Sequence, residues 1–433
     1  MMATEAAGTT GEATRANGVP LWALVASSAV SEAGSALTWI ALPWFVLVTT
    51  GSAAKTGLTG FAVALPGFVA GLFGGTVVDR FGYKRASIAA DLVSGLGIML
   101  VPLLYHTVGL AFWQLLALVF VGALLGVPGF TARRAMIPEL AALAHTRLER
   151  ANAAFEAVQS VALLLGPPLA GVLIAWLGAS NVLWLDAASF AISAGAVAVA
   201  IPAVAAGARR AATGRYFAEL ARGLRFLRQD RVLFPLAIGL AIGNFLSNAF
   251  VAVALPVWVK DVYGRPTVLG LLVAVFGAGA LAGALGYGAV GHRLSRRALW
   301  IAPEVCAAVM YAVFALAPAL FIIAAVLVVV GVFSGPTNPL LVTIRHERTP
   351  VELRGRVFAT FSAIAQVASP LGVVIAGYAI QGFGLRPTLL ALAAVAAVVS
   401  AGMLFVPAFR ELQAPATGEP AMAFAQHEGG SES

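Results

Sequence analysis

The chain has 433 residues, of which 60% are hydrophobic and only 11% are charged. Soluble globular proteins have about 45–50% apolar and about 25% charged residues, so this composition excludes an ordinary soluble enzyme and a disordered chain. A single cysteine, Cys306, excludes an intrachain disulfide framework and a cysteine-based metal cluster. The formal net charge of +8 raises the question of nucleic-acid binding, which the positions of the basic residues answer below.

A transmembrane helix needs about 20 predominantly apolar residues, and the chain contains twelve such stretches. No removable signal peptide is expected before the first of them, because the polar N-terminal residues lack its pattern. The sequence therefore predicts an all-α membrane protein with twelve transmembrane helices. The predicted spans cover residues 21–48, 56–78, 86–105, 110–130, 152–176, 181–201, 233–259, 267–291, 299–317, 319–340, 356–380 and 387–407.

The basic residues are distributed unequally between the two sides of the predicted membrane domain. Of the 27 Lys and Arg residues, all but Lys55, Lys260, Arg265 and Arg386 fall on the side of the termini. Because cytoplasmic loops are enriched in Lys and Arg, both termini are expected in the cytoplasm. Arg133 is assigned to the loop after the fourth span, and no Lys or Arg is expected in the middle of a span. The positive charge is therefore a sign of topology, and nucleic acid is excluded as a partner.

The spans fall into two sets of six that are related by duplication. Ala41-Leu42-Pro43 recurs as Ala254-Leu255-Pro256 at an offset of 213, and the same offset relates Asp91 to Glu304. Two parallel halves around a central cavity are a known transporter design. The predicted units are a cytoplasmic tail (1–20), an N-terminal half (21–201), a middle loop (202–232), a C-terminal half (233–407) and a disordered cytoplasmic tail (408–433).

The middle loop contains a helical pattern in which Phe217, Leu220, Leu224 and Leu227 share one face. Arginines occupy its other faces, which predicts an amphipathic helix. Two positions are open to this helix. It lies either on the anionic membrane surface or against the cytoplasmic ends of the bundle.

Two motifs resemble those of the major facilitator superfamily. The loop Gly75-Thr-Val-Val-Asp79-Arg80-Phe81-Gly82-Tyr83-Lys84-Arg85 is similar to its G-x-x-x-D-R-x-G-R-R/K loop, with Tyr83 where a basic residue is usual. Gly166-Pro167-Pro168-Leu169-Ala170-Gly171 resembles its antiporter motif, with Ala170 in place of a glycine. The resemblance implies a conformational latch formed by Gly75, Asp79, Arg80, Gly82, Lys84 and Arg85, and an antiporter-like bend at Gly166, Pro167 and Gly171. A positively charged anchor and a bend for packing alone are the respective alternatives.

Three further segments, 150–153, 185–190 and 354–358, are similar to bacterial exporters related to macrolide-efflux and enterobactin-efflux proteins. This resemblance extends over about residues 21–407. It implies a proton-coupled antiporter of the bacterial cytoplasmic membrane that exports a hydrophobic or amphiphilic molecule such as an antibiotic, siderophore or natural product. Uptake or flipping of a lipid or nutrient by the same fold is one alternative, and a non-transporting membrane sensor is another. The fourth predicted span lacks the arginine that drug/proton antiporters usually carry there.

Five carboxylates lie within predicted spans, namely Glu32, Asp91, Glu156, Asp186 and Glu304. An ionisable residue inside the membrane is costly and marks a functional site by default. Glu32 is the deepest, about eleven residues into the first span, which at about 1.5 Å per residue places it near the midplane. The other four lie closer to span ends, Asp186 near an outer one. Glu32 is thus the predicted proton-coupling residue, and Asp91 is the next candidate.

A polar face surrounds Glu32 on the first predicted span. Ser31, Ser35 and Trp39 lie on or beside this face, and Asn244 and Asn248 form the matching stripe in the seventh span. We expect these five residues to line a substrate cavity, although hydrogen bonding between helices explains the asparagines equally well.

Several motifs of enzymes and ATP-driven pumps are missing from the sequence. It contains no H-E-x-x-H zinc motif, no G-x-x-x-x-G-K-[ST] phosphate loop and no G-x-S-x-G nucleophile. We therefore expect no enzyme activity, no cofactor, no metal and no use of ATP. The predicted partners are a small-molecule substrate, protons and membrane lipid.

Overall fold

The structure is a computed structural model that describes residues 17–202 and 216–413. The side chains of residues 68–81 and 216–220, of His292 and of Gln413 also lie outside the described part. Within these ranges the chain is helical and forms no strand. Because no water is available inside a membrane to satisfy backbone N–H and C=O groups, a helix is the form expected of such apolar segments.

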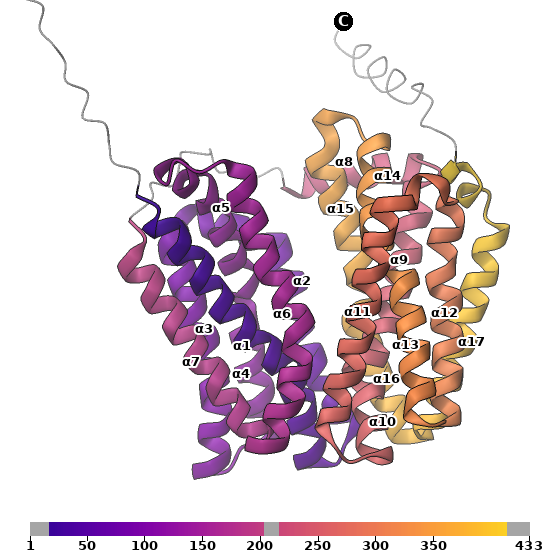
Figure 1. The fold of residues 1–433 in the computed structure, drawn as a ribbon, viewed down its shortest axis with the longest axis horizontal. Helices are drawn as coiled ribbons and strands as arrows, with labels where there is room; N and C mark the ends of the chain where they lie inside the picture. Colours follow the sequence, from indigo (N-terminus) through magenta and orange to yellow (C-terminus); the bar gives the residue numbers. More distant parts are fainter. Residues whose placement is uncertain (1–16, 203–215, 414–433) are drawn as a thin grey trace, which may run out of the picture.

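The first half of the chain forms one helical bundle and the second half forms another beside it (Figure 1). The first bundle comprises α1 (Val19–Thr50), α2 (Ala53–Phe81), α3 (Tyr83–Thr107), α4 (Phe112–Leu124), α5 (Gly126–Leu143), α6 (Leu148–Leu177) and α7 (Ala179–Ala200). The second comprises α9 (Leu233–Ala249), a π-helical turn (Phe250–Ala254), α10 (Leu255–Val262), α11 (Pro266–Val290), α12 (Arg296–Leu316), α13 (Leu320–Ser334), α14 (Thr337–Arg348), α15 (Arg354–Val367), α16 (Ser369–Phe383) and α17 (Leu385–Phe405).

These helices follow the twelve predicted spans in order. Eleven helical segments of the described chain are long and apolar enough to cross a membrane, and the 29-residue α2 takes the place of the second predicted span. Four spans consist of two consecutive pieces: α4 with α5, α9 with α10, α13 with α14, and α15 with α16. The predicted fold, an all-α membrane protein of two six-span halves, is confirmed.

The fourth span is longer than the sequence predicted. Its expected end was residue 130, but α5 follows α4 after one residue and continues to Leu143, so the whole segment is Phe112–Leu143. Arg133 therefore lies inside a helix and is 5% exposed. The assignment of Arg133 to a loop was wrong, because the first arginine after an apolar run was taken as the end of the helix.

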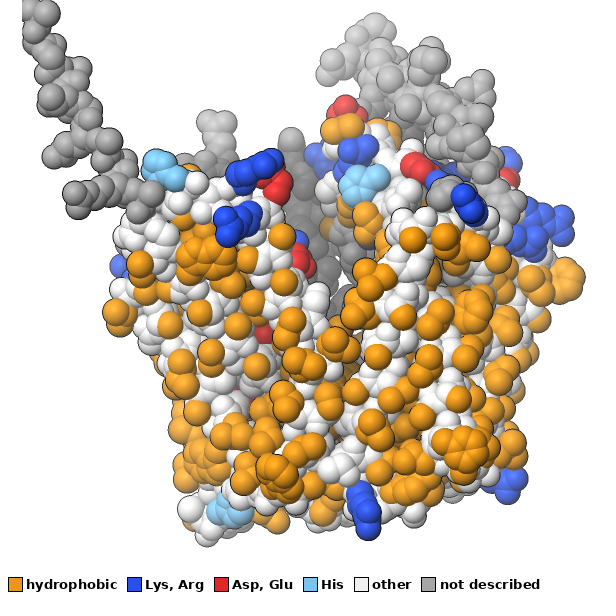
Figure 2. All heavy atoms as spheres, in the orientation of Figure 1, with side chains coloured by type: hydrophobic (Ala, Val, Ile, Leu, Met, Phe, Trp, Pro, Cys, Tyr) orange, Lys and Arg blue, Asp and Glu red, His pale blue; other side chains and the backbone are white. Residues whose placement is uncertain are grey.

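The two ends of the molecule differ in charge. Most Lys and Arg side chains gather at the end where α1 begins and α17 ends, and few lie at the other end (Figure 2). We call these the basic end and the opposite end.

The two halves contact each other closely at the opposite end. There, Gly57 of α2 faces Gly377 of α16, and Gly171 of α6 faces Gly270 of α11. A Cβ atom on Gly270 would lie 2.4 Å from the carbonyl oxygen of Pro167, so only glycine permits this approach. The Lys260 Nζ atom also donates a hydrogen bond to the Leu47 carbonyl at 3.3 Å. Toward the basic end the ribbons of the two halves diverge (Figure 1).

The helix of the middle loop, α8 (Tyr216–Gln229), packs on the second bundle. Its Gly223 lies against Arg356 and Thr360 of α15, where an added Cβ would be 2.8 Å from the Arg356 carbonyl oxygen. Phe226 and Leu227 are buried in the core of that half. The described residues of α8 thus occupy the position against the bundle, while the side chains of Phe217 and Leu220 lie outside the described part.

We expect Gly270→Leu to disfavour the arrangement that is closed at the opposite end. Forcing a side chain into a tight contact costs about 1–3 kcal/mol, which corresponds to a shift of about 5–150-fold in a conformational equilibrium. Electron–electron distance measurements between spin labels on Leu143 and Val351, both exposed at the basic end, should show a population with a shorter separation. Gly286→Leu on the same helix is the control, because nothing lies within 4 Å of a Cβ there. An unchanged distance distribution in Gly270→Leu would contradict the assignment.

Candidate substrate cavity and intramembrane charges

A cavity of about 450 Å³ lies between the two halves. Its size falls within the range of about 300–1,000 Å³ that is typical of small-molecule sites. Most of its wall is apolar, including Ile40, Val63, Val119, Val251 and Leu269. The polar lining residues are Ser35, Thr38, Trp39, Thr59, Ser94, Asp186 and Asn248.

The residues predicted to line a cavity divide into two groups. Ser35, Trp39 and Asn248 lie in its wall, and Trp39 is 47% exposed. Ser31 of α1 is buried and does not belong to the lining. Asn244 donates from its Nδ2 atom to the Ala365 carbonyl oxygen at 2.9 Å, which ties α9 to α15.

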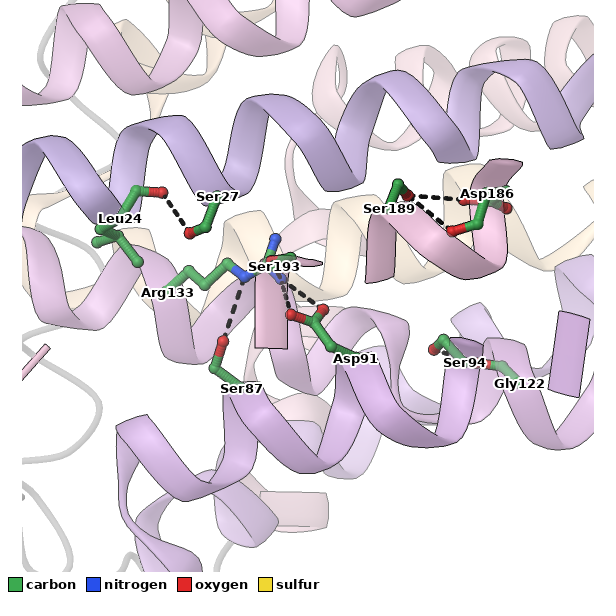
Figure 3. A network of polar contacts seen from close by, with 10 residues as sticks. All are labelled: Leu24, Ser27, Ser87, Asp91, Ser94, Gly122, Arg133, Asp186, Ser189 and Ser193. Carbon is green, nitrogen blue, oxygen red and sulfur yellow. Dashed lines mark hydrogen bonds and ion pairs between the residues drawn. The ribbon is translucent and has the colours of Figure 1, made fainter. Parts of the chain in front are cut away.

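Asp186 is the only charged side chain among the described residues of the cavity wall. Its carboxylate lies against the middle of α1, where a Cβ on Gly34 would come 2.6 Å from Oδ1. The Ser189 hydroxyl donates to the Asp186 carbonyl oxygen at 2.8 Å and lies 3.3 Å from Oδ1 (Figure 3). The sequence had placed Asp186 near an outer end. That position was counted along α7 alone, which has 22 residues. The structure adds that α7 packs beside the 32-residue α1, so that Asp186 faces the middle of the longer helix.

A buried ion pair joins three helices of the first half (Figure 3). Arg133 of α5 binds both carboxylate oxygens of Asp91 on α3. The same guanidinium donates to Ser193 Oγ of α7 at 2.9 Å and to Ser87 Oγ at 3.2 Å. Both charges are almost fully buried, so their mutual neutralisation and the two hydroxyls replace the lost water. The sequence analysis missed Arg133, although the need of Asp91 for a partner inside the membrane was a signal for it.

Glu32 lies close to this pair without joining it. Its half-buried side chain is within electrostatic reach of both Arg133 and Asp91, yet it has no hydrogen bond or ion pair to any described residue. It also lies outside the cavity lining. A single guanidinium therefore lies near two carboxylates. Because it already pairs with Asp91, a negative charge on Glu32 would have no cation of its own.

Only part of the predicted latch lies in the described chain. Gly75, Asp79 and Arg80 belong to the segment whose side chains are outside it. Gly82 adopts a φ of 79°, a conformation that favours glycine, at the turn between α2 and α3. Lys84 Nζ donates to the carbonyl oxygens of Ala198 and Ile201 at 2.8 and 2.6 Å, at the basic end of α7, while Arg85 is exposed.

The predicted antiporter-like bend lies within the uninterrupted helix α6, which contains Pro167 and Pro168. A Cβ on Gly166 would come 2.4 Å from the Ala36 side chain, and one on Gly171 would come 2.8 Å from the Pro266 carbonyl oxygen. These glycines therefore let α6 approach α1 and α11 closely.

A family model of the Major Facilitator Superfamily matches residues 24–265 and 237–426. The chain belongs to the major facilitator superfamily. This confirms the resemblance read from the sequence motifs. Within the superfamily, the chain is 34% identical over 347 residues to the multidrug efflux pump Tap of Mycolicibacterium fortuitum, covering 79% of this chain and 85% of that protein. It is 22% identical to macrolide efflux protein A of Streptococcus pyogenes, covering 70% and 74%.

Solved structures of superfamily transporters share the fold. The nucleoside transporter NupG aligns with a TM-score of 0.71 and 11% identity, over 89% of this chain and 98% of that one. A bacterial homologue of the lysosomal transporter Spinster, solved inward-facing and unoccupied, aligns with a TM-score of 0.68 and 15% identity, over 90% and 97%. Within the described residues, no group of three or more His, Cys, Asp or Glu residues could hold a metal.

We expect Arg133→Gln to destabilise the protein by about 3–5 kcal/mol, because it leaves Asp91 buried without its partner. Unfolding by SDS in mixed micelles measures this free energy. The double variant Asp91→Asn with Arg133→Gln should recover part of the loss, since it removes both charges. Arg134→Gln is the matched control, because the neighbouring Arg134–Glu156 pair is about half exposed and is worth about 0–1 kcal/mol. Equal losses in Arg133→Gln and Arg134→Gln would contradict the buried-pair assignment.

Proposed function

We propose that this protein is a proton-coupled exporter of hydrophobic or amphiphilic small molecules in the cytoplasmic membrane of a bacterium. The observation that carries the proposal is an apolar cavity with a single carboxylate between two halves that are closed at the opposite end. By the positive-inside rule the basic end faces the cytoplasm, and both termini lie there. The ribbons of the two halves diverge toward this end (Figure 1), and in this scheme the cavity takes up substrate from the cytoplasm or the inner leaflet.

The cavity wall suits substrates that are mainly apolar. Trp39 and Phe190 provide aromatic surface, and the aliphatic lining gains free energy from every apolar group it shields from water. Asp186 adds one negative charge in surroundings of low dielectric constant, where it attracts a cationic group strongly. The relatives named as multidrug and macrolide efflux proteins support the export of such molecules.

Proton coupling is assigned to Glu32 and the Arg133–Asp91 pair. When Glu32 is protonated, the pair is neutral and undisturbed. When Glu32 loses its proton, it competes with Asp91 for the single guanidinium, which pulls α1 toward α5. Because α1 also carries Ser35, Thr38 and Trp39 in the cavity wall, the proton and the substrate act on the same helix. The segment from Gly75 to Arg85 serves in this scheme as a latch between conformations.

We expect an imposed proton gradient to drive accumulation of a lipophilic cation, tetraphenylphosphonium, in proteoliposomes that contain the protein. A protonophore should abolish accumulation, and ATP should have no effect. Glu32→Gln imitates the protonated carboxyl in shape, so it should bind the probe normally but lose accumulation against a gradient.

Two results would contradict this function. Transport that needed ATP or continued unchanged with the protonophore would exclude proton coupling. Accumulation by Glu32→Gln at the wild-type rate would move the coupling role to Asp91. Glu352→Gln, which removes an exposed carboxylate at the basic end, is the control.

We expect Asp186→Asn to weaken binding of tetraphenylphosphonium by about tenfold or more, equivalent to at least about 1.4 kcal/mol. Binding of a neutral probe, chloramphenicol, should change little, because the apolar wall is intact. Quenching of Trp39 fluorescence reports binding. Trp176→Phe is the control, because it removes an exposed tryptophan outside the cavity lining and should leave the binding signal unchanged. An equal loss of affinity for both probes would contradict a charge-specific role of Asp186. If lysolipid alone competed with the probes for binding, the alternative of lipid flipping would be favoured.

A further inference from the structure

A carboxylate of the second half, Glu304, has no part in the cavity or in the Arg133–Asp91 pair. It is the ninth residue of α12, about 12 Å from the basic-end start of that helix at about 1.5 Å per residue. Its half-buried side chain rests on α9, where a Cβ on Gly243 would lie 2.5 Å from Oε1. Among the described residues it has neither a hydrogen bond nor an ion pair.

The internal duplication explains why Glu304 has no partner. Glu304 corresponds to Asp91, and aligning Pro350 with Pro138 places Arg345 at the position of Arg133. In the second half, however, the Arg345 guanidinium lies over the rings of Phe358 and Phe361, 5.1 and 5.2 Å from their centroids. Its Nε atom donates to the Leu341 carbonyl oxygen at 3.3 Å. Two aromatic rings therefore take the cation that the first half uses to neutralise its carboxylate.

No other described charge replaces that cation. Glu304 forms no ion pair with any described Lys, Arg or His residue, and the nearby phenol of Tyr311 on its own helix is uncharged. Helices α9 and α13 carry no titratable side chain. The remaining titratable groups on α12 and on the elements packed against it are Cys306, Arg386, Glu411 and the basic-end set Arg296, Arg297, Arg345, His346, Glu347 and Arg348, of which Arg296 pairs with Glu347.

We propose that Glu304 is a proton-binding site of the second half, separate from the substrate cavity. An unpaired carboxyl in a medium of low dielectric constant becomes neutral by taking up a proton. The site takes H⁺ from water and returns it to water, and only the carboxyl O–H bond forms and breaks. This inference rests on the proposed function for its role in transport, but proton binding itself is testable without any substrate.

Helix α9 connects this site to the cavity. Gly243, under the carboxyl, and Asn248, in the cavity wall, are five residues apart and thus about 140° apart around the helix. One face of α9 therefore contacts Glu304 and another contacts the substrate. The π-helical turn that follows contributes Val251 and Ala252 to the cavity wall, and such turns are frequent at functional sites. Loss of the proton would place an uncompensated charge on α12 directly against Gly243 of α9 and displace α9.

Infrared difference spectroscopy of the purified protein, titrated through neutral pH without substrate, tests the proton site. We expect a carbonyl-stretch band of a protonated carboxyl that is absent from Glu304→Gln and present in Glu352→Gln. Gly243→Ala keeps the acid but pushes the carboxyl away from α9, so it should shift the midpoint of that band. An identical band in Glu304→Gln and the wild type would overturn the proposal. This result would stand whether or not the protein exports tetraphenylphosphonium.

The role in transport is tested by the number of protons moved for each tetraphenylphosphonium ion in proteoliposomes. Glu304→Gln should lower this ratio. The rate at which the probe exchanges across the membrane in the absence of a gradient should stay within about twofold of the wild-type rate, because Glu304 is outside the cavity lining. A purely structural role would reduce both. An unchanged ratio would overturn the proposal.

Discussion

Water is absent from the hydrocarbon interior of a membrane, so each charge placed there requires a partner of opposite sign or a proton. The first half meets this requirement by a full pair, in which Arg133 holds Asp91 with two serine hydroxyls. Glu32, Asp186 and Glu304 have no such cation among the described residues. These three carboxyls are therefore the positions where a proton or a cationic ligand changes the charge of the membrane domain most directly.

The contact between the two halves depends on a different constraint, the absence of side chains. At the opposite end, glycines on α2, α6, α11 and α16 bring the backbones of the two halves into contact. Such contacts are made by dispersion forces and contain few hydrogen bonds, so they separate without stranding buried polar groups. The charges of the first half lie within one bundle and move with it as a unit. A rigid-body motion can thus open one end and close the other without carrying these charges across the contact between the halves.

Much of the fold was predictable from the sequence, because the membrane imposes span length and charge asymmetry directly. The spans, the duplication and the family motifs all follow from local patterns. The charges inside the bundle were harder to place. Arg133 was assigned to a loop because hydropathy alone ends a helix at the first arginine, although α5 continues for another ten residues. The neighbours of Asp186 were not predictable either, because no single span shows that this carboxylate packs against Gly34 in the middle of α1.

The duplicated halves have come to differ at equivalent positions. Asp91 is paired with Arg133, whereas Arg345, at the equivalent position in the second half, lies over the rings of Phe358 and Phe361 instead of pairing with Glu304. A neutralised pair fixes helices in place, while a lone carboxyl responds to protons. The same sequence unit thus provides a neutralised pair in one half and an unpaired carboxyl in the other. Helix α1 carries Glu32 and α9 rests against Glu304, and both helices also line the cavity. In the proposed mechanism, each half therefore connects proton binding mechanically to the substrate site.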